Sequence, residues 1–298
     1  MKYLHICLLV TALGSVQALA KNYSWDTTAP VCQILDKAPI PAYSLDLTYV
    51  SEGHFDGYGD SSILELDGYL ELAYFYDVLS GDLDLNLDFN GTLFLSAAEL
   101  QLPNQLMALA LDTGLTWRYL NGTAIQLRVA PGIYSDVESI SFGNWYMPFS
   151  LAGIKRFTST LSGIAGVEIR AGFDRIIMPI AGLVWAPDNS FRLEATLPEA
   201  QAIYYWDDIW TSYIGWTWES TTYSIREKSD YDREKITLES YRTFIGTSYA
   251  ISDQLRLIGE AGITSGRKVI FEETPDDMDD SIDISSDLFI KFGIGGPF

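Results

Sequence analysis

The chain has 298 residues, with 40 acidic and 19 basic side chains and a formal net charge of −21. This balance excludes nucleic-acid binding, which needs a basic footprint. With two cysteines, and no run of 18 or more apolar residues beyond the first twenty positions, neither a disulfide framework nor a transmembrane helix is expected.

The N-terminus has the pattern of a secretory signal peptide over residues 1–20. Lys2 gives a basic start, an apolar run covers 6–13, and Ala18-Leu19-Ala20 is a small-residue cleavage site. Cleavage removes Cys7 and leaves Cys32 as the single thiol, so the fold must hold without an internal disulfide. We therefore expect an exported protein.

Residues 21–43 contain three prolines and show little periodicity. We expect them to form an N-terminal periplasmic extension or a plug of the interior of the domain that follows. That domain, 44–298, is predicted to be a single β unit, because a period of two dominates the chain from about residue 44 onward.

The alternation is clearest in the second and third predicted strands. Leucines and tyrosines from Leu64 to Tyr76 share one face, and Leu83 to Leu95 repeat the pattern on the next strand. The opposite faces carry Glu65, Asp67, Tyr69 and Glu71, then Asp82, Asp84, Asn86, Asp88 and Asn90. In a soluble sandwich the apolar set faces a core, whereas in a membrane barrel it faces lipid and the polar set lines the lumen.

Three observations favour the membrane barrel. The strands 62–76, 82–95 and 106–119 are long, whereas soluble strands cluster near ~5–6 residues. Aromatic side chains gather at strand ends, as an interfacial girdle requires. Tight turns such as Asn121-Gly122, Phe173-Asp174 and Ser252-Asp253 also alternate with longer polar connections at 52–62, 96–105, 136–156, 229–235 and 274–282.

Strand counting predicts a transmembrane antiparallel up-and-down barrel of about 14 strands. The segments are 43–51, 62–76, 82–95, 106–119, 123–135, 157–171, 174–185, 190–197, 200–206, 209–219, 220–228, 236–251, 254–273 and 283–298. A break at Gly266 would give an odd number, which single-chain bacterial barrels avoid, and one phase runs from Leu255 to Phe271. The 174–206 region is apolar on both faces in part, so 12 strands remain an alternative.

The last strand alternates up to the C-terminus. Leu288, Ile290, Phe292, Ile294 and Phe298 share one face, opposite Asp287 and Lys291. This pattern resembles the C-terminal assembly signal of bacterial outer-membrane barrels, carried here by Phe292, Ile294 and Phe298.

Two further stretches, like the terminal strand, resemble an uncharacterised family of bacterial outer-membrane β-barrel proteins. They are Gly182–Leu193, with Leu197-Pro198 after it, and Gly262–Arg267. The likeness covers most of the chain beyond residue 43. It implies a fold and a location in the outer membrane, and it supplies no catalytic residues.

The sign of the inward charges suggests a function. The acidic lumen candidates are Glu65, Asp67, Glu71, Asp82, Asp84 and Asp88, and the basic ones are Arg118, Arg128, Arg170, Arg242, Arg256 and Lys291. An acidic wall facing basic residues across water favours passage of charged or polar solutes, with a preference for cations. The alternative is that these groups pair across adjacent strands and fill a closed interior.

Catalysis is not expected. His54, the histidine left after signal cleavage, lies in a predicted loop, and neither a Gly-x-Ser-x-Gly elbow nor a His-Glu-x-x-His motif is present. The acidic run 276–280 lacks EF-hand spacing and is best explained as a solvated loop. Aromatic residues between Tyr204 and Trp218 are better explained as membrane anchors than as a sugar platform. We expect no metal and no cofactor.

The sequence thus predicts a porin-like outer-membrane channel for small polar or cationic solutes, with both termini in the periplasm. Expected partners are outer-membrane lipid, the barrel-assembly machinery and small polar solutes. One alternative is a plugged structural or surface-binding barrel that acts through its outer loops. Another is a transporter of apolar ligands with residues 21–43 as a hatch, against which the inward acidic rows count.

Overall fold

The computed structural model describes residues 43–56, 59–95, 102–136, 144–225, 235–272 and 281–296. The predicted signal peptide, Cys32, nearly all of the predicted 21–43 extension, the acidic run 276–280 and Phe298 lie outside these ranges. In the described part of the chain, no helix has the length and apolar character needed to cross a membrane.

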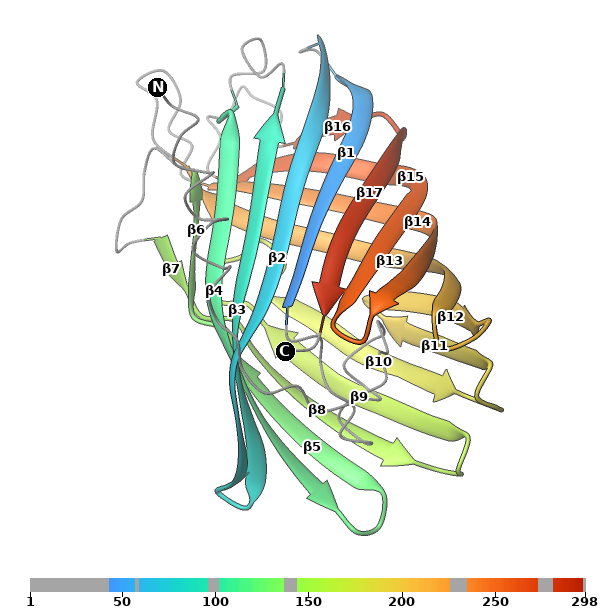
Figure 1. The fold of residues 1–298 in the computed structure, drawn as a ribbon. Helices are drawn as coiled ribbons and strands as arrows, with labels where there is room; N and C mark the ends of the chain where they lie inside the picture. The colour runs from blue at the N-terminus through green and yellow to red at the C-terminus, as the bar shows by residue number, and fades with distance from the viewer. Residues whose placement is uncertain are drawn as a thin grey trace.

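Seventeen strand segments follow one another along the chain (Figure 1). They are β1 (Tyr43–Phe55), β2 (Gly59–Val78), β3 (Gly81–Phe94), β4 (Gln105–Tyr119), β5 (Thr123–Val129), β6 (Gly132–Asp136), β7 (Trp145–Tyr146), β8 (Phe149–Arg156), β9 (Leu161–Ile169), β10 (Ile177–Trp185), β11 (Phe191–Leu197), β12 (Glu199–Tyr205), β13 (Trp210–Ser224), β14 (Lys235–Ser252), β15 (Leu255–Glu272), β16 (Ser281–Ile284) and β17 (Asp287–Gly296). Successive strands pair antiparallel, and β17 pairs with β1 to close the sheet.

The closed sheet is a 14-stranded antiparallel barrel, which confirms the predicted fold class. β5 with β6, β7 with β8, and β16 with β17 each cross the wall as one interrupted strand. Tyr43 pairs with Gly296, so the first and last described strands meet at one end of the barrel. We call this the terminal end, where the connections 79–80, 120–122 and 253–254 are short, and the opposite end the loop end.

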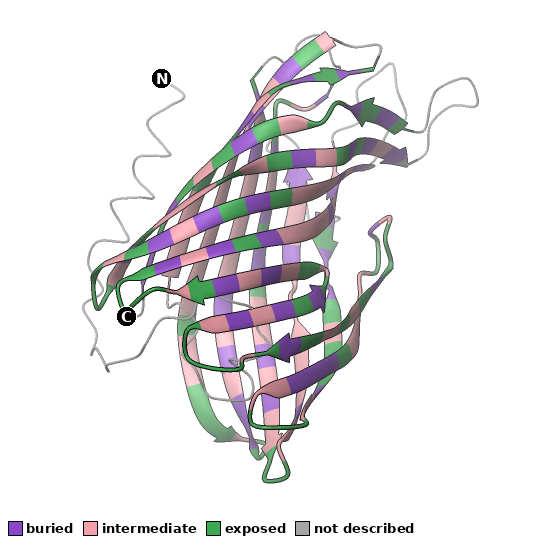
Figure 2. Ribbon diagram, turned by 90° about the vertical axis from the view of Figure 1, so that its right-hand side faces the viewer, coloured by how far each residue is buried: buried purple, intermediate pink, exposed green. Residues whose placement is uncertain are grey.

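The outer surface of the barrel is apolar, as the alternation predicts. Exposed and buried positions alternate along the strands (Figure 2). On the closing strand Leu288, Ile290, Phe292 and Ile294 are 64, 48, 67 and 40% exposed, while Phe289 between them is 2% exposed. Large apolar side chains left outside on strand after strand form a surface that faces lipid rather than water.

A charge placed on this belt is expected to destabilise the barrel in lipid. Ile290→Lys puts an ammonium group on the outer face of β17, which costs about 2–4 kcal/mol near the bilayer midplane. The same change at Leu120, in the exposed turn after β4, is expected to alter stability by less than about 0.5 kcal/mol. Urea unfolding in vesicles measures both, and equal effects would contradict a lipid-facing belt.

The barrel narrows at its loop end. Pro131 and Pro148 interrupt two neighbouring strands at the same height, because proline cannot donate to the ladder. Beyond this bend Ser135 of β6 pairs in parallel with Ser224 of β13. A smaller ring therefore closes there, made of β13, β14, β15, β16, β1, β2, β3, β4 and β6.

The predicted strand count is right, although two of the predicted strands are wrong. The region 136–156, expected as a long connection, contains β7 and β8. The segments 209–219 and 220–228, expected as two strands, include the single strand β13. The two errors cancel in the count. They reverse the direction of every predicted strand between them, so Phe173-Asp174, expected as a turn of the terminal end, lies at the loop end.

Three bulges change which side chains face inward, one of them between Val50 and Gly53 on β1. A register shift after Glu71 brings Tyr74, expected on the lipid face, opposite the inward Asp84. A third shift, in the β14–β15 pairing, lies near Gly266, whose φ of 54° suits glycine. β15 is one strand, as predicted, but Val269 is buried inside rather than in phase with the lipid face.

Candidate functional site

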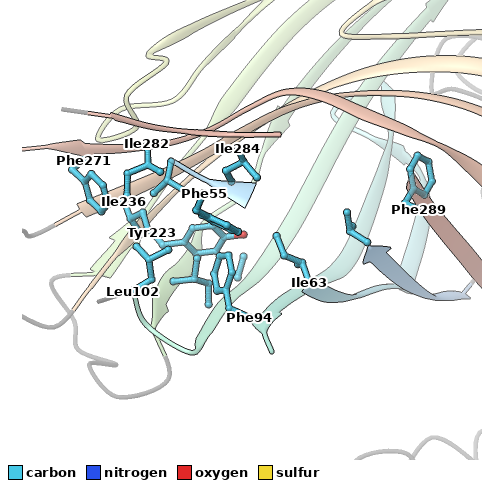
Figure 3. Close-up of a cluster of buried hydrophobic side chains, with 14 of the residues drawn as sticks. Phe55, Ile63, Phe94, Leu102, Tyr223, Ile236, Phe271, Ile282, Ile284 and Phe289 are labelled. Atoms are coloured by element: carbon cyan, nitrogen blue, oxygen red, sulfur yellow. The ribbon is translucent and has the colours of Figure 1, made fainter. Parts of the chain in front are cut away.

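An apolar neck closes the interior at the loop end. Phe55, Ile236 and Val269 are fully buried, and the rings of Phe55 and Phe94 meet edge to face at 6.4 Å (Figure 3). We define the neck cluster as Val50, Phe55, Ile63, Phe94, Leu102, Leu106, Tyr223, Ile236, Val269, Phe271, Ile282 and Ile284. These side chains come from both sides of the small ring, so the neck is filled by packing across the interior.

Polar contacts across the interior lie next to the neck. Arg242 of β14 donates to both carboxylate oxygens of Glu65 on β2 at 2.7 Å, and it also contacts Glu219 at 3.1 Å. The Tyr223 hydroxyl donates to Asn90 Oδ1 at 2.8 Å, which links β13 to β3. A cavity of about 40 Å³ between the neck and Arg242 is too small for a solute larger than a water molecule or two.

We call the part of the interior between this layer and the terminal end the chamber. Its β3–β5 wall carries neighbouring ion pairs. Arg128 of β5 contacts Asp84 at 3.0 Å and forms a close ion pair with Asp112. Arg118 pairs closely with Asp82. These ion pairs therefore join strands of the same wall.

Other carboxylates of the chamber reach solvent. Glu199 is exposed, and the side chains of Glu219 and Glu168 are 44 and 27% exposed. Among the described residues Asp88 and Glu71 make no ion pair, and the same holds for Glu199. The chamber therefore carries an excess of hydrated negative charge.

All twelve lumen candidates lie on the inward register of their strands or at a strand end. Glu65 and Arg242 meet across the interior, and Lys291 contacts Glu260 at 2.8 Å. Arg256 lies near the terminal end, where it donates to Ser248 and to the Asp208 carbonyl. The residues that the sequence interpretation did not name share the inward register: Asp46, Asp112, Glu168, Arg192, Glu194, Glu199, Glu219, Glu260 and Arg267. Continuing the alternation along β4, β11 and β15 points to Asp112, Arg192, Glu194 and Glu260, whereas the bulge near Gly266 hides Arg267.

The chamber has an apolar wall as well. Ala124, Ile154, Ile164 and Val184 pack together on the inner faces of β5, β8, β9 and β10. The two faces of these strands therefore differ little in polarity. This explains why their alternation is weak.

Residues 170–176, between β9 and β10, form a strap that contacts the loop-end part of β13 and β14. Arg170 donates to the Ser220 carbonyl at 2.6 Å, and the Asp174 amide donates to Thr222 Oγ1 at 3.1 Å. Arg175 contacts Glu239 at 3.2 Å. The strap lies on the loop-end side of the β11–β12 hairpin, because that hairpin ends opposite Thr217 and the strap contacts β13 beyond this point.

The imidazole of His54 makes a local contact, whereas the backbone of this residue pairs with Ser285. Its Nδ1 lies 2.7 Å from Asp60 Oδ1, and the two side chains are 61 and 55% exposed. An exposed pair of this kind lies on the surface rather than in the chamber.

A family model matches residues 99–275, which is more than half of the chain. Its description is "Domain of unknown function (DUF6268)". The chain belongs to this family. DUF6268 covers the strands from β4 to β15, including the strap and the apolar wall of the chamber. No curated protein matches the chain.

Several solved structures are similar to this DUF6268 protein. An outer membrane channel from Pseudomonas putida F1 shares 11% identity at a TM-score of 0.43, over 94% of this chain and 100% of that one. A FadL homologue from Pseudomonas aeruginosa shares 10% at 0.41, over 86 and 90%. A KdgM porin shares 10% at 0.37, over 86 and 99%.

Proposed function

We propose that the barrel is a gated channel of the outer membrane for small polar or cationic solutes, shut at the neck in the conformation described. The observation that carries this is the hydrated chamber with excess carboxylate. Charges inside a barrel are costly unless they are paired or hydrated. A purely structural barrel gains nothing from unpaired acids such as Asp88 and the exposed Glu199, whereas a cation path does.

We place both termini in the periplasm. Short turns gather at the terminal end, and the longer connections between strands gather at the loop end. Bacterial barrels have short periplasmic turns and long outer loops, which supports this orientation. A protease added to intact cells tests it, because cleavage is expected only within the loop-end connections.

The chamber acids are expected to set ion selectivity. Asp84 is paired with Arg128, so its neutralisation would also leave a cation unpaired. The test is therefore Asp88→Asn with Glu199→Gln, which removes carboxylates that have no ion-pair partner in the described part of the chain. In a planar bilayer with a KCl gradient, this double variant is expected to move the reversal potential toward zero. Glu52→Gln, on the exposed outer face of β1, is the matched control, and an equal shift there would contradict the assignment.

A second candidate function is a closed barrel that acts through its loop end. The filled neck is the observation that favours it. The two proposals differ in what happens when the neck is emptied, because a gated channel then conducts selectively through the chamber. A closed structural barrel would stay silent or leak without selectivity.

A further inference from the structure

The outward-facing basic side chains of the loop-end half gather on one face. In the described part of the chain these are Arg175, Lys235 and Lys268, on the strap, β14 and β15. Other described cations point inward or lie near the terminal end, as Lys155 does. A cluster of cations on the outside of a strongly acidic barrel cannot serve the chamber.

This face is hollowed into a groove of about 430 Å³ whose lining includes Arg175, Glu239, Tyr241, Gly266 and Lys268. Glu239 is buried and is held by Arg175 at 3.2 Å and by Trp218 Nε1 at 3.2 Å. The side chains of Arg175 and Lys268 are 49 and 47% exposed, so both present donors to the groove. Gly266 keeps the floor open, because a Cβ there would lie 2.8 Å from the Tyr241 ring.

The position of the groove along the barrel axis shows which layer of the membrane surrounds it. Tyr241 stacks with Trp216 and Trp218, with ring centroids 5.9 and 6.2 Å apart. On the terminal side of this stack, Ile245 and Ile263 are 65 and 50% exposed on the lipid belt. Stacked aromatics above an apolar belt mark the membrane–water boundary, so the groove lies in the headgroup layer.

We propose that this groove binds the phosphorylated sugar headgroup of an outer-leaflet lipid. Arg175 and Lys268 hold the phosphate, as charge-assisted donors do. Tyr241, which lines the groove and stacks on Trp218, offers an apolar edge to the sugar ring. The pair between Lys268 and Asp283, at 3.3 Å between half-exposed side chains, is weak enough to exchange for a phosphate. Binding needs the loop end to face outward, and it does not need conduction.

The test uses the full barrel in neutral detergent, titrated with a diphosphorylated glucosamine-disaccharide lipid and followed by native mass spectrometry. The wild type is expected to retain this lipid. Arg175→Gln with Lys268→Gln is expected to weaken retention about tenfold or more, as lost charge-assisted contacts do. Lys155→Gln, at the other end of the barrel, is the matched control and is expected to change nothing.

Three further arms decide the chemistry. The dephosphorylated lipid is expected to bind as weakly as the double variant binds the intact one, and equal retention would overturn the role of the phosphate. Phosphatidylglycerol retained as well as the sugar lipid would overturn the sugar specificity. Lys268→Gln alone, at a half-exposed site, covers the case in which the double variant fails to fold, and unchanged binding there would contradict the groove.

Discussion

Emptying the neck is expected to turn a mostly silent barrel into a conducting one. Phe55→Ser with Phe94→Ser removes the two rings that meet at the centre of the neck cluster. An apolar constriction excludes water and ions, and widening and wetting it is expected to raise mean conductance by roughly an order of magnitude. Single-channel recording in planar bilayers measures this. The current is expected to be cation-selective, because the path then runs through the carboxylates of the chamber.

The control for this prediction lies on the same strand. Phe89 of β3 has the opposite register to Phe94 and points toward lipid, so Phe89→Ser removes a ring without touching the neck. Loss of Phe94 costs stability of about 3–5 kcal/mol as a large-to-small core change, so folding is checked by heat-modified migration on a gel. A folded neck variant that stays silent over a wide voltage range would refute the channel and favour the closed barrel.

Alternation predicted the strands whose two faces differ most. On β2, β3 and β17 one face meets lipid and the other carries charge, so the period of two is strong. β8 was missed because its inward Ala152 and Ile154 join the apolar wall and leave little contrast between faces. β13 was split because Ser220 and Thr222, on its outward register, are covered by the strap, so polar residues occupy both faces.

The candidate site was predictable in register but not in its contacts. Inward acids and bases follow from parity alone, which placed Glu65 and Arg242 on the same side of the wall. Their meeting across the interior depends on the narrowing at Pro131 and Pro148 and on the β6–β13 pairing, which connects residues far apart in sequence. The neck left one local signal, since Phe94 is an apolar residue in the acidic register of β3.

Removing Arg242 is expected to destabilise the barrel strongly. Its guanidinium contacts both Glu65 and Glu219 through Nη2, and its side chain is only 12% exposed. Arg242→Gln leaves both carboxylates without their cation, which costs about 3–5 kcal/mol for a buried pair. Urea unfolding in vesicles measures the loss. Lys155→Gln, at the rim, is expected to change stability by less than about 0.5 kcal/mol.

Adding Glu65→Gln to Arg242→Gln separates charge from packing. If the loss comes from uncompensated carboxylates, the double variant is expected to recover part of the stability, because only Glu219 then lacks its partner. Additive losses would instead show that Arg242 acts mainly through packing, including its position 5.7 Å from the Phe289 ring. The same double variant also tests gating. The ion pair between Glu65 of β2 and Arg242 of β14 lies beside the neck and holds the small ring closed. Its removal is therefore expected to increase channel opening even where stability is restored.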